Sequence, residues 1–251
     1  MKYLLLLISL VLLPAISLAD EVSHQYNQAT QFYRDGEYSK AIAIYENIIK
    51  NGYAHSDLYY NLANANFKLD NLPASILYYE RAKRLSPNDD DISYNLKIAN
   101  LKVVDKIEPL PRLFIFEWWQ ALSGLTSLAS WSIFSIIALW IGLFCIAAFR
   151  ITSKSFVRRL SFFSGTFLIL FALVTFIFAI QQNKIEHSTS EAIVFAANVA
   201  IKSSPDESGT DLFILHEGVK VEILDNVDKW KKIRLADGKV GWIPGEAIEI
   251  I

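Results

Sequence analysis

Residues 56–68 read SDLYYNLANANFK, and residues 90–102, which lie 34 positions further along the chain, read DDISYNLKIANLK. A Tyr-Asn pair recurs three times in this register, at Tyr26-Asn27, Tyr60-Asn61 and Tyr94-Asn95. A basic residue follows each of these asparagines, at Arg34, Lys68 and Lys102. Repetition at a fixed offset of this length predicts a stack of helical hairpins, because each repeat is one supersecondary unit that buries its apolar face against its neighbours.

The second repeat carries most of a known pattern, in Tyr59, Leu62, Ala63, Ala74, Tyr79, Ala82 and Pro87. This pattern resembles the tetratricopeptide repeat family, in which each unit of about 34 residues forms two antiparallel helices. The resemblance implies an all-α domain over residues 20–108, with units at about 22–55 and 56–89 and a capping helix at about 90–106. The first unit departs from the pattern, since it has Tyr53 in place of the terminal proline and Gln28 in place of leucine.

The last helix of this domain has a strong start signal. Asn88 and the acidic run from Asp89 to Asp91 are expected to cap its N-terminus and to complement its dipole. Because no partner helix follows it in the repeat pattern, we expect it to close the stack as a capping helix.

In the first helix of each unit, amides and cations stand three, four or seven residues apart. Positions with these spacings lie on the same side of a helix, so these side chains are expected to share one face. In tetratricopeptide domains this face lines a concave groove, so the resemblance implies a site for an extended peptide. Amides can hydrogen-bond a peptide backbone, and cations can bind a carboxylate. The candidate groove residues are Asn27, Arg34, Asn61, Asn64, Lys68, Asn95 and Lys102. The alternative is that they are ordinary consensus positions of the repeat on a solvated face.

The N-terminus has the features of a secretory signal peptide over residues 1–19. Lys2 precedes an uncharged run from Tyr3 to Ala19, and small residues stand one and three positions before the predicted cleavage after Ala19. The alternative is an anchor that is not cleaved. In either case the following domain is expected outside the cytoplasm.

Two uncharged runs are long enough to span a bilayer, at residues 131–149 and 160–180. At about 1.5 Å per residue, each matches a hydrocarbon core about 30 Å thick. Residues 150–159 between them are basic without an acidic residue, so the positive-inside rule places this loop in the cytoplasm. The alternative, two buried helices of a soluble domain, is disfavoured because a chain of this size would have to cover both uncharged helices completely.

Aromatic and basic residues flank the two predicted spans. Residues 109–130 are expected to form a proline-rich joint and an interfacial segment, because aromatic rings favour the headgroup region. The membrane-interface candidates are Trp118, Trp119, Arg150, Arg158 and Arg159. The predicted topology is a transmembrane hairpin with both folded domains on the extracytoplasmic side.

Residues 181–251 change to short alternating segments separated by turn signals, which indicates an all-β domain. The predicted strands are residues 192–195, 199–202, 219–224, 231–235 and 239–243. Asp237-Gly238 is expected to form a tight hairpin turn with positive φ at both residues. With Leu215-His216-Glu217-Gly218 and Gly241-Trp242-Ile243-Pro244, the segment resembles the bacterial SH3 family, which implies a small five-stranded barrel.

Trp230 and Trp242 have two interpretations. As in other SH3 domains, they would form an aromatic surface that binds a peptide. We favour packing in the core, because the domain has few other large residues to fill a barrel.

The chain has 251 residues, of which 53% are hydrophobic and 20% charged, with a formal net charge of -2. Its single cysteine, Cys145, excludes an intrachain disulfide, and its four histidines show no metal-ligand spacing. Near-neutrality argues against a nucleic-acid binder, which would need a basic surface. The sequence holds no phosphate-binding glycine loop, HExxH motif or nucleophile elbow, so we expect no catalysis, cofactor or metal.

The order of parts, together with the motifs KIEPLP (106–111), SSPDESGT (203–210) and IRLADG (233–238), resembles the Bacteroides aerotolerance BatE family. That resemblance implies a complex in the bacterial inner membrane with von Willebrand factor A domain proteins and a MoxR-type ATPase, linked to oxidative or envelope stress. The predicted function is a non-enzymatic scaffold whose tetratricopeptide and SH3-like modules bind proteins. The alternative is an envelope sensor whose SH3-like domain binds cell wall or peptide and signals through the hairpin. Transport is disfavoured, because neither span contains an ionisable residue.

Overall fold

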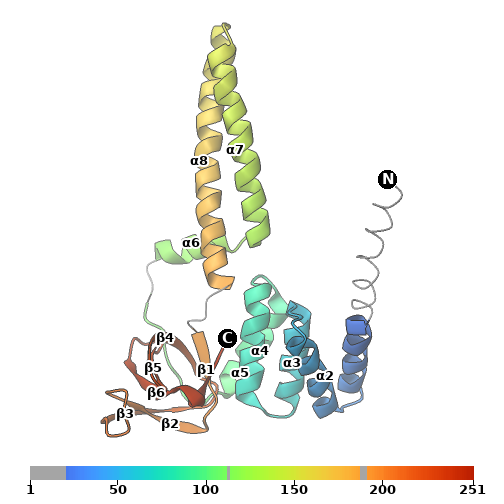
Figure 1. The fold of residues 1–251 in the computed structure, drawn as a ribbon, viewed down its shortest axis with the longest axis vertical. Helices are drawn as coiled ribbons and strands as arrows, with labels where there is room; N and C mark the ends of the chain where they lie inside the picture. Colours follow the sequence, from blue (N-terminus) through green and yellow to red (C-terminus); the bar gives the residue numbers. More distant parts are fainter. Residues whose placement is uncertain (1–20, 112–113, 187–190) are drawn as a thin grey trace, which may run out of the picture. The chain divides into compact units, whose positions relative to one another are not determined.

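The computed structural model describes residues 21–111, 114–186 and 191–251, so the predicted signal peptide lies outside the described residues. The chain divides into two compact units (Figure 1). The first unit combines residues 1–110 with residues 189–251, and the second is residues 111–188. The helical repeats and the sheet therefore form one unit, although an apolar hairpin separates them in the sequence.

The helices of the first unit follow the predicted repeat. They cover residues 21–34, α2 at Tyr38–Lys50, α3 at Ser56–Lys68, α4 at Leu72–Leu85 and α5 at Asp90–Lys102. The turns inside the two units are equivalent, because Gly36 and Asp70 both have positive φ, of 80° and 59°. The predicted cap is confirmed, since the Asp89 side chain accepts hydrogen bonds from the backbone N–H groups of Asp91 and Ile92. The last helix ends at Lys102, four residues before the predicted end, and Val103 is extended.

Seven antiparallel strands form the sheet of the first unit. They are β1 (Glu191–Val194), β2 (Asn198–Lys202), β3 (Asp211–His216), β4 (Lys220–Val227), β5 (Trp230–Arg234), β6 (Val240–Pro244) and β7 (Ile248–Ile250). Their order is β3-β2-β6-β5-β4-β1-β7. The five-strand prediction therefore missed β3 and β7. The hairpin prediction at Asp237-Gly238 was also wrong in one respect, because Gly238 alone of the two has positive φ.

The core of the sheet is aliphatic, and this corrects the preferred interpretation of the tryptophans. Ile193, Ile201 and Ile233 are fully buried, whereas Trp230 and Trp242 are half-buried and lie outside the core cluster of described residues. Strand alternation explains the difference, because neighbouring residues of a strand point to opposite faces of the sheet. Small β-branched side chains are enough to fill the space inside.

The sheet and the repeats share this core. Ile76 of α4 and Leu96 of α5 belong to the same buried cluster as Ile193 and Ile233 of the sheet. Gly218 marks the closest approach: its φ is +86°, and a Cβ atom added there would lie 3.1 Å from the Val103 side chain. One face of α5 therefore packs against the sheet, which lies beside α4 and α5 in Figure 1. The predicted capping helix thus has the sheet as a neighbour in addition to α4.

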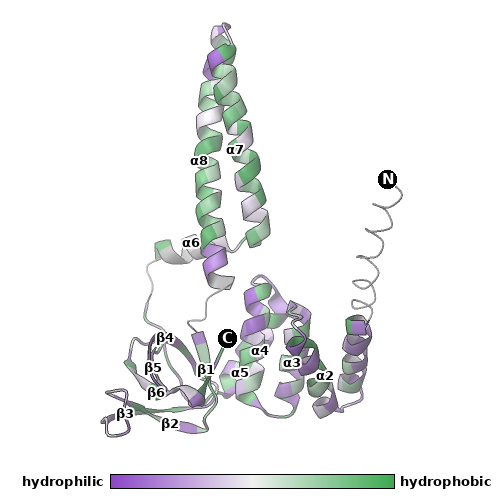
Figure 2. Cartoon of the chain, viewed as in Figure 1, coloured by the Kyte–Doolittle hydropathy of each residue, from purple (hydrophilic) through white to green (hydrophobic). Residues whose placement is uncertain are grey.

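The second unit consists of α6 (Phe114–Ser123), α7 (Leu128–Ile151) and α8 (Ser155–Glu186). Residues 128–151 and 155–184 form two helices that are long and apolar enough to cross a membrane, and the green of α7 and α8 in Figure 2 marks their hydrophobic residues. Both helices extend beyond the predicted spans, so the turn between them is only residues 152–154.

Glycines bring α7 and α8 close together. A Cβ atom added at Gly142 would lie 2.9 Å from the Ile169 side chain, and one added at Gly165 would lie 3.1 Å from the Cβ of Cys145. The Ser135 hydroxyl donates a hydrogen bond to the Ala172 carbonyl, at 3.0 Å. These small residues are therefore used within the hairpin.

Candidate functional site

Two of the predicted groove asparagines connect successive repeats. The Asn61 amide donates a hydrogen bond of 2.6 Å to the Tyr26 hydroxyl, and the Asn95 amide donates one of 2.7 Å to the Tyr60 hydroxyl. These contacts give both asparagines a structural role, as the consensus alternative supposes. Asn27, the first member of the series, is exposed and makes no such bond within the described residues.

A second pair of tyrosines lies behind this row. The Tyr79 hydroxyl donates a hydrogen bond of 2.5 Å to the Asn64 amide oxygen, and the Tyr45 hydroxyl lies 3.0 Å from the Thr30 hydroxyl. Burial raises the pKa of both tyrosines above the ordinary value, so both remain protonated near neutral pH. The hydroxyls therefore fix the polar side chains that face the groove.

An open hollow of about 300 Å³ lies between the first helices of the repeats, with Tyr79 of α4 also in its wall. Its lining residues are Tyr33, Tyr60, Asn64, Phe67, Lys68, Tyr79, Asn95 and Ile98. Three of the predicted groove residues, Asn64, Lys68 and Asn95, are thus brought together. The aromatic side chains that line the hollow were not predicted from the sequence. The signal that could have predicted them is the recurrence of tyrosines with the period of the repeat.

The three predicted cations differ in their surroundings. The Lys102 ammonium lies 2.7 Å from the Asp70 carboxylate and 4.6 Å from the centre of the Phe67 ring. Its hydrogen bond and charge hold the pKa of Asp70 below the ordinary value. Arg34 and Lys68 are exposed, and within the described ranges no carboxylate pairs with either. Lys68 is therefore the cation of the hollow that is available to a ligand.

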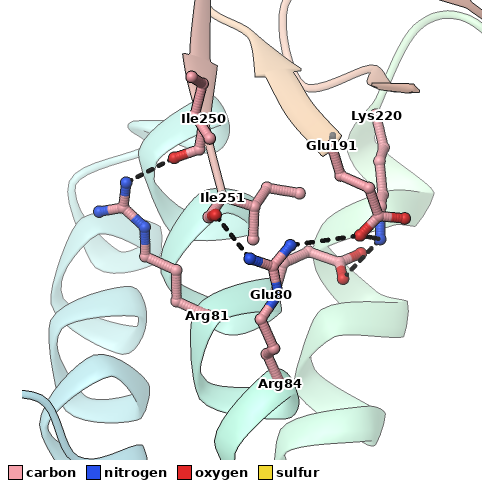
Figure 3. A network of polar contacts seen from close by, with 7 residues as sticks. All are labelled: Glu80, Arg81, Arg84, Glu191, Lys220, Ile250 and Ile251. Carbon is pink, nitrogen blue, oxygen red and sulfur yellow. Dashed lines mark hydrogen bonds and ion pairs between the residues drawn. The ribbon is translucent and has the colours of Figure 1, made fainter. Parts of the chain in front are cut away.

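Polar contacts fix the sheet against α4, as Figure 3 shows. Arg81 and Arg84 donate to the backbone carbonyls of Ile250 and Ile251, at 2.6 and 2.7 Å. Lys220 lies between two carboxylates, those of Glu80 and Glu191, each 3.0 Å away. Burial lowers the pKa of Lys220, but the two carboxylates outweigh burial, so its pKa is raised overall. We call this contact between the sheet and the helical repeats the junction. It is both apolar and ionic, and it orients the two modules relative to each other.

The two tryptophans lie on the outer face of the sheet. Cross-strand neighbours share a face, and the register pairs Trp230 with Pro244 and Lys232 with Trp242. The Lys232 ammonium lies 5.8 Å from the centre of the Trp242 ring. We call Trp230, Lys232, Trp242 and Pro244 the aromatic face.

The membrane-interface candidates fall at both ends of the hairpin. Trp118 is 70% exposed, whereas the Trp119 ring packs edge-on against Phe178 of α8, with centroids 4.8 Å apart. Arg150 lies in the last turn of α7, and the Arg158 guanidinium lies 5.0 Å from the centre of the Phe149 ring. Arg159 follows in α8 and is exposed.

Comparison with known families identifies both modules of the first unit. Residues 26–90 match the tetratricopeptide repeat model, and residues 197–249 match the bacterial SH3 domain model. No curated protein in the comparison matches the chain. Both modules are typically non-catalytic and imply protein partners. In the part of the chain that the structure describes, no group of His, Cys, Asp and Glu residues could hold a metal ion. The chain therefore combines two protein-interaction modules with two helices that are apolar enough to span a membrane.

Proposed function

We propose that this chain is a membrane-anchored adaptor whose groove binds an extended, acidic segment of a partner protein. The observation that carries the proposal is the hollow of about 300 Å³ between the first helices, with Lys68 at its wall and no carboxylate of the described chain beside it. A cation in an aromatic-walled concavity favours a carboxylate ligand. The aromatic rings supply apolar area for the neighbouring residues of the partner.

The membrane part of the proposal rests on α7 and α8. Together they provide an even number of crossings between residues 110 and 189, which belong to one folded unit. If both helices span the membrane, the two flanks of the hairpin lie on the same side. Arg150, Arg158 and Arg159 flank the short turn, so the positive-inside rule favours a cytoplasmic turn and extracytoplasmic modules.

The resemblance to the BatE family narrows the choice of partner. It favours von Willebrand factor A domain proteins of the inner membrane, in a stress-related complex served by a MoxR-type ATPase. The chain would then act as a scaffold for these proteins and would carry out no reaction itself.

The test is crosslinking of the full chain in native membranes, followed by identification of the proteins attached to residues 24–106. Lys68→Glu reverses the charge of the unpaired cation at the wall of the hollow, and it is expected to reduce recovery of the partner at least fivefold. Lys50→Glu makes the same charge change on an exposed residue of the second helix α2, so it should leave recovery unchanged. Equal recovery from all variants would refute the groove.

A second candidate function is recognition of cell wall or peptide by the aromatic face. It is favoured by the outward position of Trp230 and Trp242 beside Lys232, a combination that offers stacking area and a cation. The full chain in detergent would be incubated with purified peptidoglycan, and Trp242→Ala is expected to abolish retention. Retention that is unaffected by Trp242→Ala, or absent from the unaltered chain, would exclude this function.

A further inference from the structure

One hydrogen bond recurs between successive first helices of the stack. An asparagine of the later helix donates to a tyrosine hydroxyl of the earlier helix, as Asn95 does to Tyr60. Seven residues after this asparagine, Lys102 lies over the Phe67 ring and pairs with Asp70. The amide contact thus occurs at both steps of the stack, whereas among the described residues the cation contact occurs only between α5 and the end of α3.

At the C-terminal end of the helical stack, the residues at the equivalent positions have no following helix to contact them in the described chain. Tyr94 is the third tyrosine of the series, and Leu101 and Val104 stand 34 positions after Phe67 and Asp70. The side chains of Tyr94, Leu101 and Val104 are 66%, 69% and 68% exposed. In the described chain no amide reaches the Tyr94 hydroxyl.

At the N-terminal end of the stack, the equivalent amide and cation have no preceding helix to contact in the described chain. The helix of residues 21–34 carries Asn27 and Arg34 with the same spacing of seven residues, and both side chains are exposed. Within the described residues no earlier helix offers them a tyrosine or a ring. One chain therefore ends in an exposed tyrosine acceptor beside apolar side chains and begins with an exposed asparagine donor.

We propose that two copies of this chain join end to end, with residues 21–34 of one copy packed along α5 of the next. Asn27 then donates to the Tyr94 hydroxyl of the other copy, and Arg34 covers Leu101. The hydrogen bond repeats the Asn–Tyr contact already present twice within each chain, while Leu101 and Val104 replace the ring and the carboxylate with apolar surface. Because donor and acceptor lie on different surfaces, the association is head-to-tail and open-ended. This inference is independent of what the groove binds.

The sequence of the first helix agrees with a second copy as the occupant. Leu62 and Leu96 pack against the second helix of the preceding unit, but the equivalent residue of the first helix is Gln28. In the described chain α5 is followed by the sheet and by no second helix, so an apolar residue at position 28 would meet no helical groove. The contact between copies is consequently limited to the first helices, and its area is small. Association therefore depends on the high local concentration of chains confined to a membrane.

Cysteine crosslinking in membranes tests the contact directly. Two full-length forms with different tags, both with Cys145→Ser, would be co-expressed, one with Arg34→Cys and the other with Val104→Cys. The spacer would be the shortest reagent that links Asp70→Cys to Lys102→Cys within one chain, where the unaltered side chains lie 2.7 Å apart. We expect a mixed dimer in at least fivefold higher yield than when Val104→Cys is replaced by Asp91→Cys, an exposed site at the N-terminal end of α5, whereas Val104 follows its C-terminal end.

Further variants connect the crosslink to the proposed hydrogen bond. Tyr94→Phe in one form or Asn27→Ala in the other is expected to lower the yield about fivefold, and both together should lower it no further. A mixed yield equal to that of the Asp91→Cys control would overturn the proposal. So would a yield unaffected by Tyr94→Phe, or self-linking of the Arg34→Cys form that is as efficient as mixed linking.

Discussion

The helical repeats and the sheet bury different kinds of residue. The repeats bury tyrosines, such as Tyr45 and Tyr79, whose hydroxyls reach polar partners at the edge of the core. The sheet buries isoleucines, keeps its tryptophans outside, and contains no tyrosine in residues 191–251. Stacked helices leave gaps that long amphipathic rings can cross, whereas the interior of a small sheet takes short branched side chains. The size of an aromatic side chain therefore does not by itself show whether that side chain lies in the core.

The largest expected effect separates the core of the sheet from its aromatic face. Ile233→Ala removes a fully buried side chain and is expected to lower the free energy of unfolding by about 3 kcal/mol. Trp242→Ala removes a larger side chain from the outer face and should cost only about 1 kcal/mol. Denaturant titration of the full chain in detergent, followed by circular dichroism, would measure both. If Trp242→Ala lowered the free energy of unfolding more than Ile233→Ala, Trp242 would have to be assigned to the core.

The junction between the two regions gives the next effect. Gly218→Ala forces an alanine into positive φ and also places its Cβ 3.1 Å from Val103, so we expect a loss of about 2 kcal/mol. Gly36→Ala imposes the same backbone strain with no atom within 4 Å, and should cost about 1 kcal/mol. The difference, measured by the same titration, reports the packing between sheet and repeats. Equal losses would mean that the junction contributes nothing at this point.

A smaller effect concerns the hydroxyls of the repeat. Tyr79→Phe keeps the ring but removes the hydrogen bond to Asn64, and we expect it to lower the free energy of unfolding by about 1 kcal/mol. Tyr94→Phe serves as the matched control, because its side chain is 66% exposed and bonds to nothing in the described chain, and it should change the stability of an isolated chain very little. If the two variants were equally stable, the buried tyrosines would be acting only as rings.

The smallest effect is a dependence on alkaline pH that arises in the repeats. Burial raises the pKa of Tyr26, Tyr33, Tyr45, Tyr78 and Tyr79 in the folded chain. The unfolded chain ionises first as pH rises through about 10, so this stability is complete below that value and is lost above it. Up to pH 9.5 the loss should stay below about 1 kcal/mol. Unfolding at several pH values, with tyrosinate absorbance as the second signal, would show whether ionisation and unfolding coincide.

Sequence periodicity predicted the parts of the fold that depend on neighbours in the chain. The repeat offset and the Asp89 cap are local features, and both appear in the structure. The tryptophans were misplaced because their size was weighed above the alternation of β6, which already put Trp242 and Ile243 on opposite faces. The junction could not be predicted, since Lys220 and Glu80 are separated by 140 residues and no local pattern joins them. The groove was predicted in part, because its cations follow the repeat while its walls depend on how the helices stack.

The shared core also sets an order of events during synthesis. Ile76 and Val103 are made before the hairpin, but the residues that cover them, such as Gly218, are made after it. The repeat half of every new chain therefore presents an uncovered apolar surface until residues 191–251 have been made and packed against it. If the hairpin spans a membrane, insertion of both helices precedes completion of the fold. A copy whose hairpin then failed to insert would retain the uncovered surface, which chaperones or proteases can recognise.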